Sequence, residues 1–275
     1  MAIIKAFKNL IKHPIVMLPD LLLAIFILVL AKFTLVWTGV EGLLATDITE
    51  DILRNFFQEN LFQVLWPLVI FFFTTFIIGV GEKVIKLELI ANVVRHKKAS
   101  LGYALKHKFH FFFRVISMKV LIFLIIALGF IAIFWVIGYL VFLIINPFDY
   151  LLANQASTVV TILLAASGLI LLKLGFLFRY PIMFMTKTIN PYRVLIESVK
   201  KFNKNRKFTF QVWLMTIIVA ILFGILTFLL SIVPWGVISY LIILIGVIHH
   251  TWLDMFIFLK FKEKFSKSLS RQKLP

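Results

Sequence analysis

The sequence predicts an all-α membrane protein, with six transmembrane helices arranged as three hairpins and basic amphipathic interfacial helices on the cytoplasmic side. Composition is the first reason: 62% of the 275 residues are hydrophobic and 15% are charged, whereas soluble domains are about half apolar and about a quarter charged. The second reason is that the apolar residues gather in six runs, each long enough to cross a hydrocarbon core of about 30 Å. A single polytopic membrane domain over residues 1–275 is therefore expected.

The predicted spans cover residues 16–38, 61–81, 116–145, 158–186, 209–232 and 235–259. The first follows a basic N-terminus, as in a signal peptide, but it is too long for one and lacks a small-x-small cleavage site, so we interpret it as a retained span. Pro67 and Pro181 are expected to kink the second and fourth spans. The third is the longest and must tilt or begin along the interface. The last two are separated only by the neighbourhood of Val233, Pro234 and Trp235.

Basic residues are distributed very unevenly among the segments between these spans. Of the 29 Lys and Arg residues, 26 lie in alternate segments, and Arg54 is the only one in the intervening segments. The basic segments are 1–15, 82–119, 179–207 and 260–275. Because basic residues that flank spans stay on the cytoplasmic side, both the N- and the C-terminus are predicted to be cytoplasmic. This alternation independently supports an even number of spans.

The basic segments also contain short stretches with one apolar and one basic face. Asn190 followed by Pro191 is a typical helix start, and Ser100 is a second candidate cap. Such helices lie in the head-group plane of a membrane, although each stretch could instead be a frayed extension of the neighbouring span. The residues predicted to contact lipid head groups are Lys5, Lys8, Lys12, Arg95, Lys97, Lys98, Lys200, Lys201 and Lys204.

The formal net charge of +17 would indicate a nucleic-acid partner in a soluble protein. Here the basic residues flank apolar runs, so anionic membrane lipids are the expected partners, together with other membrane proteins, and no nucleic acid is expected. The chain has no cysteine, which excludes disulfides and thiolate metal sites. It also lacks a phosphate-binding glycine loop and a nucleophile elbow, so no catalytic residue, metal site or cofactor is predicted.

Two stretches resemble known families. The N-terminal "IIKAFKNLIKHPIVMLPDLLLAIFILVL" is similar to the opening of several poorly characterised prokaryotic six-helix integral membrane protein families. The stretch "YPIMFMTKTINPYRVLIESVKKFNKNRKF" resembles the amphipathic segment before the fifth span in those families. The plan is also similar to that of the membrane domain attached to some glycerophosphodiester phosphodiesterases. The resemblance implies the six-helix fold and the cell membrane of a prokaryote, and it implies no activity.

Ionisable residues inside spans are costly and therefore point to function or to specific pairing. The candidate intramembrane polar cluster comprises Lys173, Arg179, His249, His250 and Asp254. His250 and Asp254 lie four residues apart, so they share a helix face. A structural role, in which these residues join the sixth span to a neighbour, is the main interpretation; proton or ion handling and metal catalysis are the alternatives. Near the end of the second span, Glu82 and Lys86 are expected to form a surface ion pair.

The preferred functional hypothesis is a non-enzymatic protein that interacts with lipid or organises the membrane through its basic cytoplasmic face. The alternative is a small-solute or proton-coupled transporter that uses Lys173, His250 and Asp254. A membrane-embedded hydrolase or transferase is the second alternative, and the missing motifs count against it.

Overall fold

The computed structural model describes residues 2–44, 56, 58, 60–186, 190–232 and 236–271, and side chains are described for these except at 107–109, 236–237 and 266–271. Within this part of the chain the secondary structure is helical and contains no strand. The all-α class is thus confirmed for the described residues, among which six helices are long and apolar enough to cross a membrane, as many as the spans predicted. They cover Pro14–Thr38, Leu61–Val94, His110–Ile145, Tyr150–Thr186, Arg206–Ser231 and Ile238–Phe265. The protein is therefore a multi-pass membrane protein.

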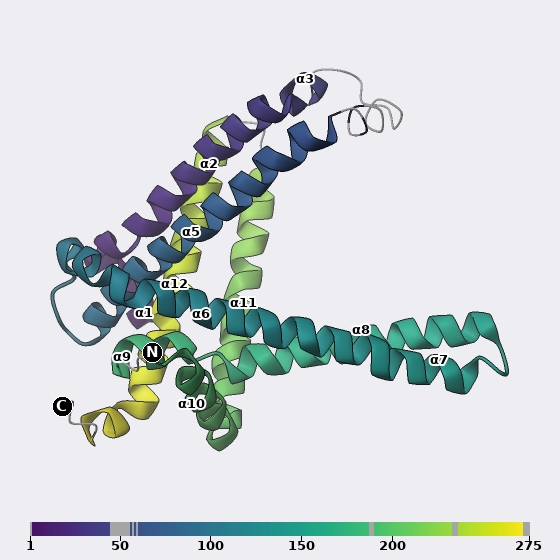
Figure 1. The fold of residues 1–275 in the computed structure, drawn as a ribbon. Helices are drawn as coiled ribbons and strands as arrows, with labels where there is room; N and C mark the ends of the chain where they lie inside the picture. Colours follow the sequence, from purple (N-terminus) through teal and green to yellow (C-terminus); the bar gives the residue numbers. More distant parts are fainter. Residues whose placement is uncertain are drawn as a thin grey trace. The chain divides into compact units, whose positions relative to one another are not determined.

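The chain divides into two compact units, which are described separately. Unit 1 comprises Met1–Phe112 and Leu222–Met255. It contains α1 (Ala2–Lys12), the 3₁₀ turn η1 (Pro14–Val16), α2 (Leu18–Thr38), α3 (Val40–Leu44), α5 (Leu61–Val94) and parts of α6 (Leu101–Ala132), α11 (Arg206–Ser231) and α12 (Gly236–Arg271). Figure 1 shows the labelled helices along the chain.

Helix α2 packs along α5, and the two ends of α5 differ in character. Large apolar side chains such as Phe72 and Phe73 are exposed in its first half, where lipid would surround them. From Val80 onward most side chains are buried, including several charged ones. Helix α2 ends at Thr38, and the following Gly39, with a φ of 72°, caps it in the left-handed conformation. The core of unit 1 therefore lies at the α5 end that leads to residue 94.

Unit 2 comprises Phe113–Ile221 and Phe256–Pro275. Besides the remaining parts of α6, α11 and α12, it contains the π-helical turn η2 (Ile133–Gly138), α7 (Tyr139–Ile145), α8 (Tyr150–Gly175), α9 (Arg179–Thr186) and α10 (Pro191–Lys204). Both η2 and α7 pack against α8. Ser157 donates a 2.7 Å hydrogen bond to the carbonyl of Gly138, and a Cβ atom at Gly138 would lie only 2.7 Å from the Thr161 hydroxyl. Glycine thus permits this close helix contact.

Helix α10 begins where its sequence predicts. The Asn190 side chain accepts hydrogen bonds from the backbone N–H groups of Tyr192 and Arg193, and Pro191 occupies the first turn. Ser198 then donates a 2.7 Å hydrogen bond to the carbonyl of Gly175, which ties α10 to the end of α8. The prediction of a separate helix from Pro191 is confirmed.

Several helices extend beyond the predicted spans. Helix α5 continues to Val94, past the predicted span 61–81. Helix α6 begins at Leu101, directly after the candidate cap Ser100, and runs without interruption to Ala132, so this stretch is continuous with the third span. Helix α8 begins at Tyr150, inside the predicted 146–157 connection, because the Asp149 side chain caps it by accepting from the N–H of Leu152. Arg54 and residues 233–235 lie outside the described part of the chain.

The fourth span is interrupted rather than simply kinked. Helix α8 ends at Gly175, a turn covers residues 176–178, and α9 begins at Arg179. Pro181 explains this position, since its ring clashes with the carbonyl four residues earlier, at Leu177, and it cannot donate to that carbonyl. Pro67, by contrast, lies inside the continuous helix α5.

Candidate functional site

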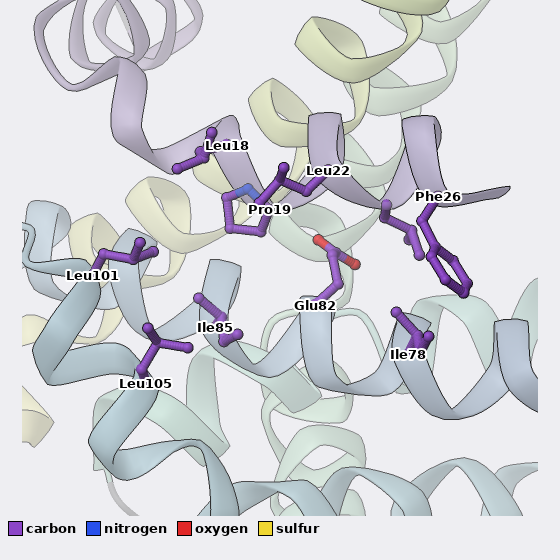
Figure 2. Close-up of a pocket in the computed structure, with 10 residues that line it drawn as sticks. Leu18, Pro19, Leu22, Phe26, Ile78, Glu82, Ile85, Leu101 and Leu105 are labelled. Carbon is purple, nitrogen blue, oxygen red and sulfur yellow. The ribbon is translucent and has the colours of Figure 1, made fainter. Parts of the chain in front are cut away.

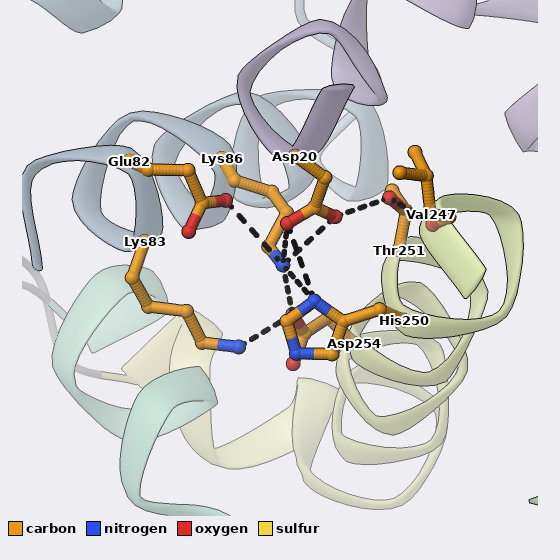
Figure 3. A network of polar contacts seen from close by, with 8 residues as sticks. All are labelled: Asp20, Glu82, Lys83, Lys86, Val247, His250, Thr251 and Asp254. Carbon is orange, nitrogen blue, oxygen red and sulfur yellow. Dashed lines mark hydrogen bonds and ion pairs between the residues drawn. The ribbon is translucent and has the colours of Figure 1, made fainter. Parts of the chain in front are cut away.

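Charged side chains from three helices of unit 1 meet in a buried ionic cluster (Figure 3). Helix α2 contributes an aspartate from its first turn, α5 contributes three residues from its second half, and α12 contributes three residues from one face. The members of this ionic cluster are Asp20, Glu82, Lys83, Lys86, His250, Thr251 and Asp254. Lys83 and Lys86 project from α5 toward the face of α12 that bears Asp254.

Lys86 is the centre of the ionic cluster. Its side chain has no exposed surface, and its Nζ lies 2.7 and 3.0 Å from the two carboxylate oxygens of Asp20. The same Nζ lies 3.0 Å from Oδ2 of Asp254. A buried lysine is tolerated only when anions and acceptors surround its ammonium group, and here two carboxylates from different helices do so. Lys86 therefore joins α2, α5 and α12.

Asp20 has polar partners beyond Lys86. The Thr251 hydroxyl lies 2.5 Å from Oδ2 of Asp20 and 2.9 Å from the carbonyl oxygen of Val247, so its single proton is donated to one of these acceptors or shared between them. The Nδ1 atom of His250 lies 3.2 Å from Oδ1 of Asp20 and 3.0 Å from Nζ of Lys86. Asp20 occupies the first turn of α2, where a negative charge interacts favourably with the helix dipole. These contacts explain how a carboxylate remains buried at the beginning of a span.

Asp254 also pairs with Lys83, whose Nζ lies 2.7 Å from its Oδ2. The Asp254 side chain is 9% exposed, so one carboxylate lies within ion-pair distance of two lysines in a nearly closed environment. Lys83 and Lys86 are three residues apart on α5 and therefore lie on one helix face. That spacing allows both to reach α12.

Of the three carboxylates in the ionic cluster, Glu82 lies farthest from a lysine. Its Oε1 lies 3.6 Å from Nζ of Lys86, and this buried oxygen has no hydrogen-bond partner among the described residues. The cluster contains three carboxylates, from Asp20, Glu82 and Asp254, and two lysines. A proton on Glu82 or on His250, or a further cation, would balance it. The predicted Glu82–Lys86 ion pair is present, but its predicted surface location is wrong because Lys86 is fully buried.

The five residues predicted to form the intramembrane polar cluster are placed differently from one another. His250 and Asp254 belong to the ionic cluster, where His250 contacts Asp20 and Asp254 contacts the two lysines. His249 stacks on Phe223, with ring centroids 4.7 Å apart. The other two belong to unit 2: Lys173 is exposed, while Arg179 donates to the carbonyl of Phe176 and lies over the Tyr180 ring.

Sequence reasoning missed Asp20 and Lys86 as members of the site, although a signal for them exists. Asp20 lies inside the first predicted span and Lys86 lies shortly after the second, and ionisable residues at such positions require partners of opposite charge. Asp20, Glu82, Lys86 and Asp254 all lie near the span ends predicted to face the cytoplasm. Grouping span-end charges of opposite sign would have proposed their pairing.

The predicted head-group residues are mostly exposed. On α1, Ala6 and Leu10 are buried while Lys5, Lys8 and Lys12 are exposed. On α10, Val194 and Leu195 are buried while Lys200 and Lys204 are exposed. The prediction also included three residues that follow α5, of which Lys97 and Lys98 are exposed and Arg95 is half-buried.

Lys201 differs from the other predicted head-group residues. Its Nζ lies 4.5 Å from the centroid of the Phe265 ring and 5.6 Å from that of Phe261. These rings belong to an aromatic group in unit 2 that includes Phe178 and Phe208. Burial lowers the pKa of Lys201, a change that Glu197 opposes and Lys204 reinforces. Its ammonium group is thus directed at aromatic faces.

Among the described residues, no group of three or more His, Asp or Glu side chains is arranged to hold a metal ion. Comparison with known proteins adds no assignment, because no family model, curated protein or solved structure matches the chain.

Proposed function

We propose that this multi-pass membrane protein is non-enzymatic and binds anionic lipid head groups through the exposed lysines of α1 and α10. The observation that carries the proposal is the same two-faced arrangement on both helices. Each buries an apolar face and exposes lysines: Lys5, Lys8 and Lys12 on α1, and Lys200 and Lys204 on α10. Helices of this kind bind the head-group region of a membrane.

The charge distribution supports a location and an orientation for this surface. With 26 of the 29 basic residues in alternate segments, α1 and α10 lie on the cytoplasmic side, together with both termini. The resemblance to prokaryotic six-helix membrane families supports the cell membrane of a prokaryote. Each lysine near an anionic surface contributes about 1 kcal/mol of attraction, which salt screens over roughly 8–10 Å.

The Lys8→Gln/Lys12→Gln double variant tests this proposal. We expect wild-type protein in mixed bilayers to prefer spin-labelled phosphatidylglycerol over spin-labelled phosphatidylcholine, and the variant to lose part of this preference because two charges leave α1. Electron paramagnetic resonance of the motionally restricted lipid measures the preference at low and high salt. High salt is expected to reduce it in the wild type.

The matched control is Lys32→Gln/Lys173→Gln, which also removes two exposed lysines but from within spans. It should retain the wild-type lipid preference. Equal association of both lipids with the wild-type protein at low salt would refute the proposal, as would an equal loss of preference in the two double variants.

A second candidate function is proton-coupled transport, and the ionic cluster is the observation that favours it. Three carboxylates face two lysines inside candidate spans, and His250, whose side chain is 55% exposed, lies against Asp20. Chains of Asp, Glu and His side chains within membranes are typical of proton relays. In such a site, a carboxylate that is not paired with a lysine, or the neighbouring His250, would take up a proton and release it again.

For this candidate, wild-type proteoliposomes should dissipate an imposed pH gradient faster than empty liposomes do, and Asp254→Asn should return the rate to that background. Asparagine keeps the size of the side chain but removes a charge that interacts with Lys83 and Lys86. An entrapped pH-sensitive dye reports the flux. Asp149→Asn, which alters an exposed helix cap in unit 2, is the control and should transport at the wild-type rate. Unchanged flux in Asp254→Asn would exclude this candidate.

A further inference from the structure

A pocket of about 410 Å³ lies beside the ionic cluster in unit 1. It is formed by the first turns of α2, the second half of α5 and the beginning of α6 (Figure 2). Its volume falls within the roughly 300–1,000 Å³ of small-molecule sites. Ten residues line it, among them Leu22, Phe26, Ile78 and Glu82.

The lining combines an apolar wall with one charged group. Nine of these ten residues are apolar, and the tenth is Glu82, whose carboxylate lies between α2 and α5 in Figure 2. Leu22 is 57% exposed, so the pocket borders the part of α2 that would face lipid. An alkyl chain could therefore enter it from the bilayer, while the carboxylate marks where a polar head would lie.

The chemistry at Glu82 indicates which head group is complementary. Glu82 is only 8% exposed, and its buried Oε1 has no hydrogen-bond partner among the described residues. Its cation, Lys86, lies 3.6 Å away and is bonded more closely to Asp20 and to Asp254. A buried carboxylate without donors is costly, and the two lysines of the ionic cluster leave one of its three carboxylates without a lysine of its own. A ligand that brings an ammonium group to Glu82 would correct both deficits.

We propose that this pocket binds a single-chain amphiphile with a primary ammonium head, its alkyl chain against Leu22, Phe26 and Ile78 and its ammonium group on the Glu82 carboxylate. This pocket lies apart from the exposed lysines of α1 and α10, and its ligand would be cationic, whereas those lysines would bind anionic head groups. An anionic amphiphile is disfavoured, since its head would lie against the carboxylate that already lacks a partner.

The test uses the full-length protein in phosphatidylcholine nanodiscs and a dodecylamine probe that carries a diazirine in its chain. After photolysis, peptide mapping by mass spectrometry should find label on residues 18–26 and 78–85. The matched dodecanol and dodecanoate probes should label these peptides about tenfold less, because a hydrogen bond to a charged group accounts for a factor of that order. Glu82→Gln should lower labelling by the amine to the level seen with the alcohol.

Leu22→Trp provides a second variant, because it fills the pocket without altering the ionic cluster. It should suppress labelling by the amine, whereas Leu28→Trp, at a similarly exposed position on α2 outside the pocket, should not. Equal labelling by amine and alcohol in the wild type would overturn the proposal and would indicate that a proton on Glu82 balances the cluster. Unchanged labelling in Glu82→Gln, or an equal loss in both tryptophan variants, would overturn it as well.

Discussion

Lys86→Met should destabilise the protein by about 3–5 kcal/mol, the cost of breaking a buried ion pair by removing one partner. Methionine resembles the lysine stem in size but carries no charge. The variant would leave the carboxylates of Asp20, Glu82 and Asp254 together with Lys83 as the only lysine in the ionic cluster. The apparent melting temperature in detergent should fall by roughly 10 °C, measured from the loss of monodisperse protein after heating.

Two further variants separate the charge effect from other causes. Lys97→Met removes an exposed lysine just after α5 and should leave the melting temperature unchanged. Adding Asp20→Asn to Lys86→Met should recover part of the lost stability, because it removes the carboxylate that Lys86 contacts most closely. If Lys86→Met and Lys97→Met have the same melting temperature, Lys86 does not hold α2, α5 and α12 together.

The stability depends strongly on Lys86 because few other interactions favour one helix contact over another inside a membrane. Between helices in lipid, apolar contacts gain little over contacts with the acyl chains, so packing and polar pairing carry more of the association energy. Exposed phenylalanines on α5 such as Phe72 and Phe73 illustrate the first point, and Lys86, bonded to two other helices, illustrates the second. The ionic cluster thus defines which faces of α2, α5 and α12 meet.

The sequence predicts features that depend on neighbouring residues, but it does not predict contacts between remote ones. The six spans follow from local hydropathy and length, and the start of α10 follows from Asn190 and Pro191, a few residues away. The pairs in the ionic cluster are remote: Asp20 and Lys86 are 66 positions apart, and Lys83 and Asp254 are 171 apart. Local periodicity places each of these residues on a helix but cannot choose which distant helix it contacts.

His250 and Asp254 show the limit of that reasoning in one pair. Their spacing of four residues puts them on one face of a helix, and the main interpretation is that they join the sixth span to a neighbour. In the structure His250 contacts Asp20 on α2, and Asp254 contacts Lys83 and Lys86 on α5. The spacing alone identifies neither of these partner helices. The pocket beside Glu82 was equally beyond prediction, since three separate segments form it.

Helix α1 packs against a large side chain of α12. Trp252 is fully buried, and its ring stacks on Phe7 with centroids 5.4 Å apart and an interplanar angle of 26°. Its Nε1–H donates to the carbonyl of Ile3 at 3.4 Å. Because the other face of α1 carries Lys5, Lys8 and Lys12, this contact also holds the basic surface in place.

Trp252→Ala should therefore release α1 at a cost of about 3–5 kcal/mol, the usual penalty for truncating a buried tryptophan. Hydrogen–deuterium exchange of the full-length protein in nanodiscs should show faster exchange over residues 2–12. The preference for anionic lipid should weaken as well, because detached lysines no longer share one face. Trp252→Phe, which keeps a stacking ring but loses the donor, should show a smaller increase, and Trp66→Ala, at a position that is 63% exposed, should show none. Unchanged exchange over α1 in Trp252→Ala would mean that other contacts hold this helix, and that its lysines are presented independently of α12.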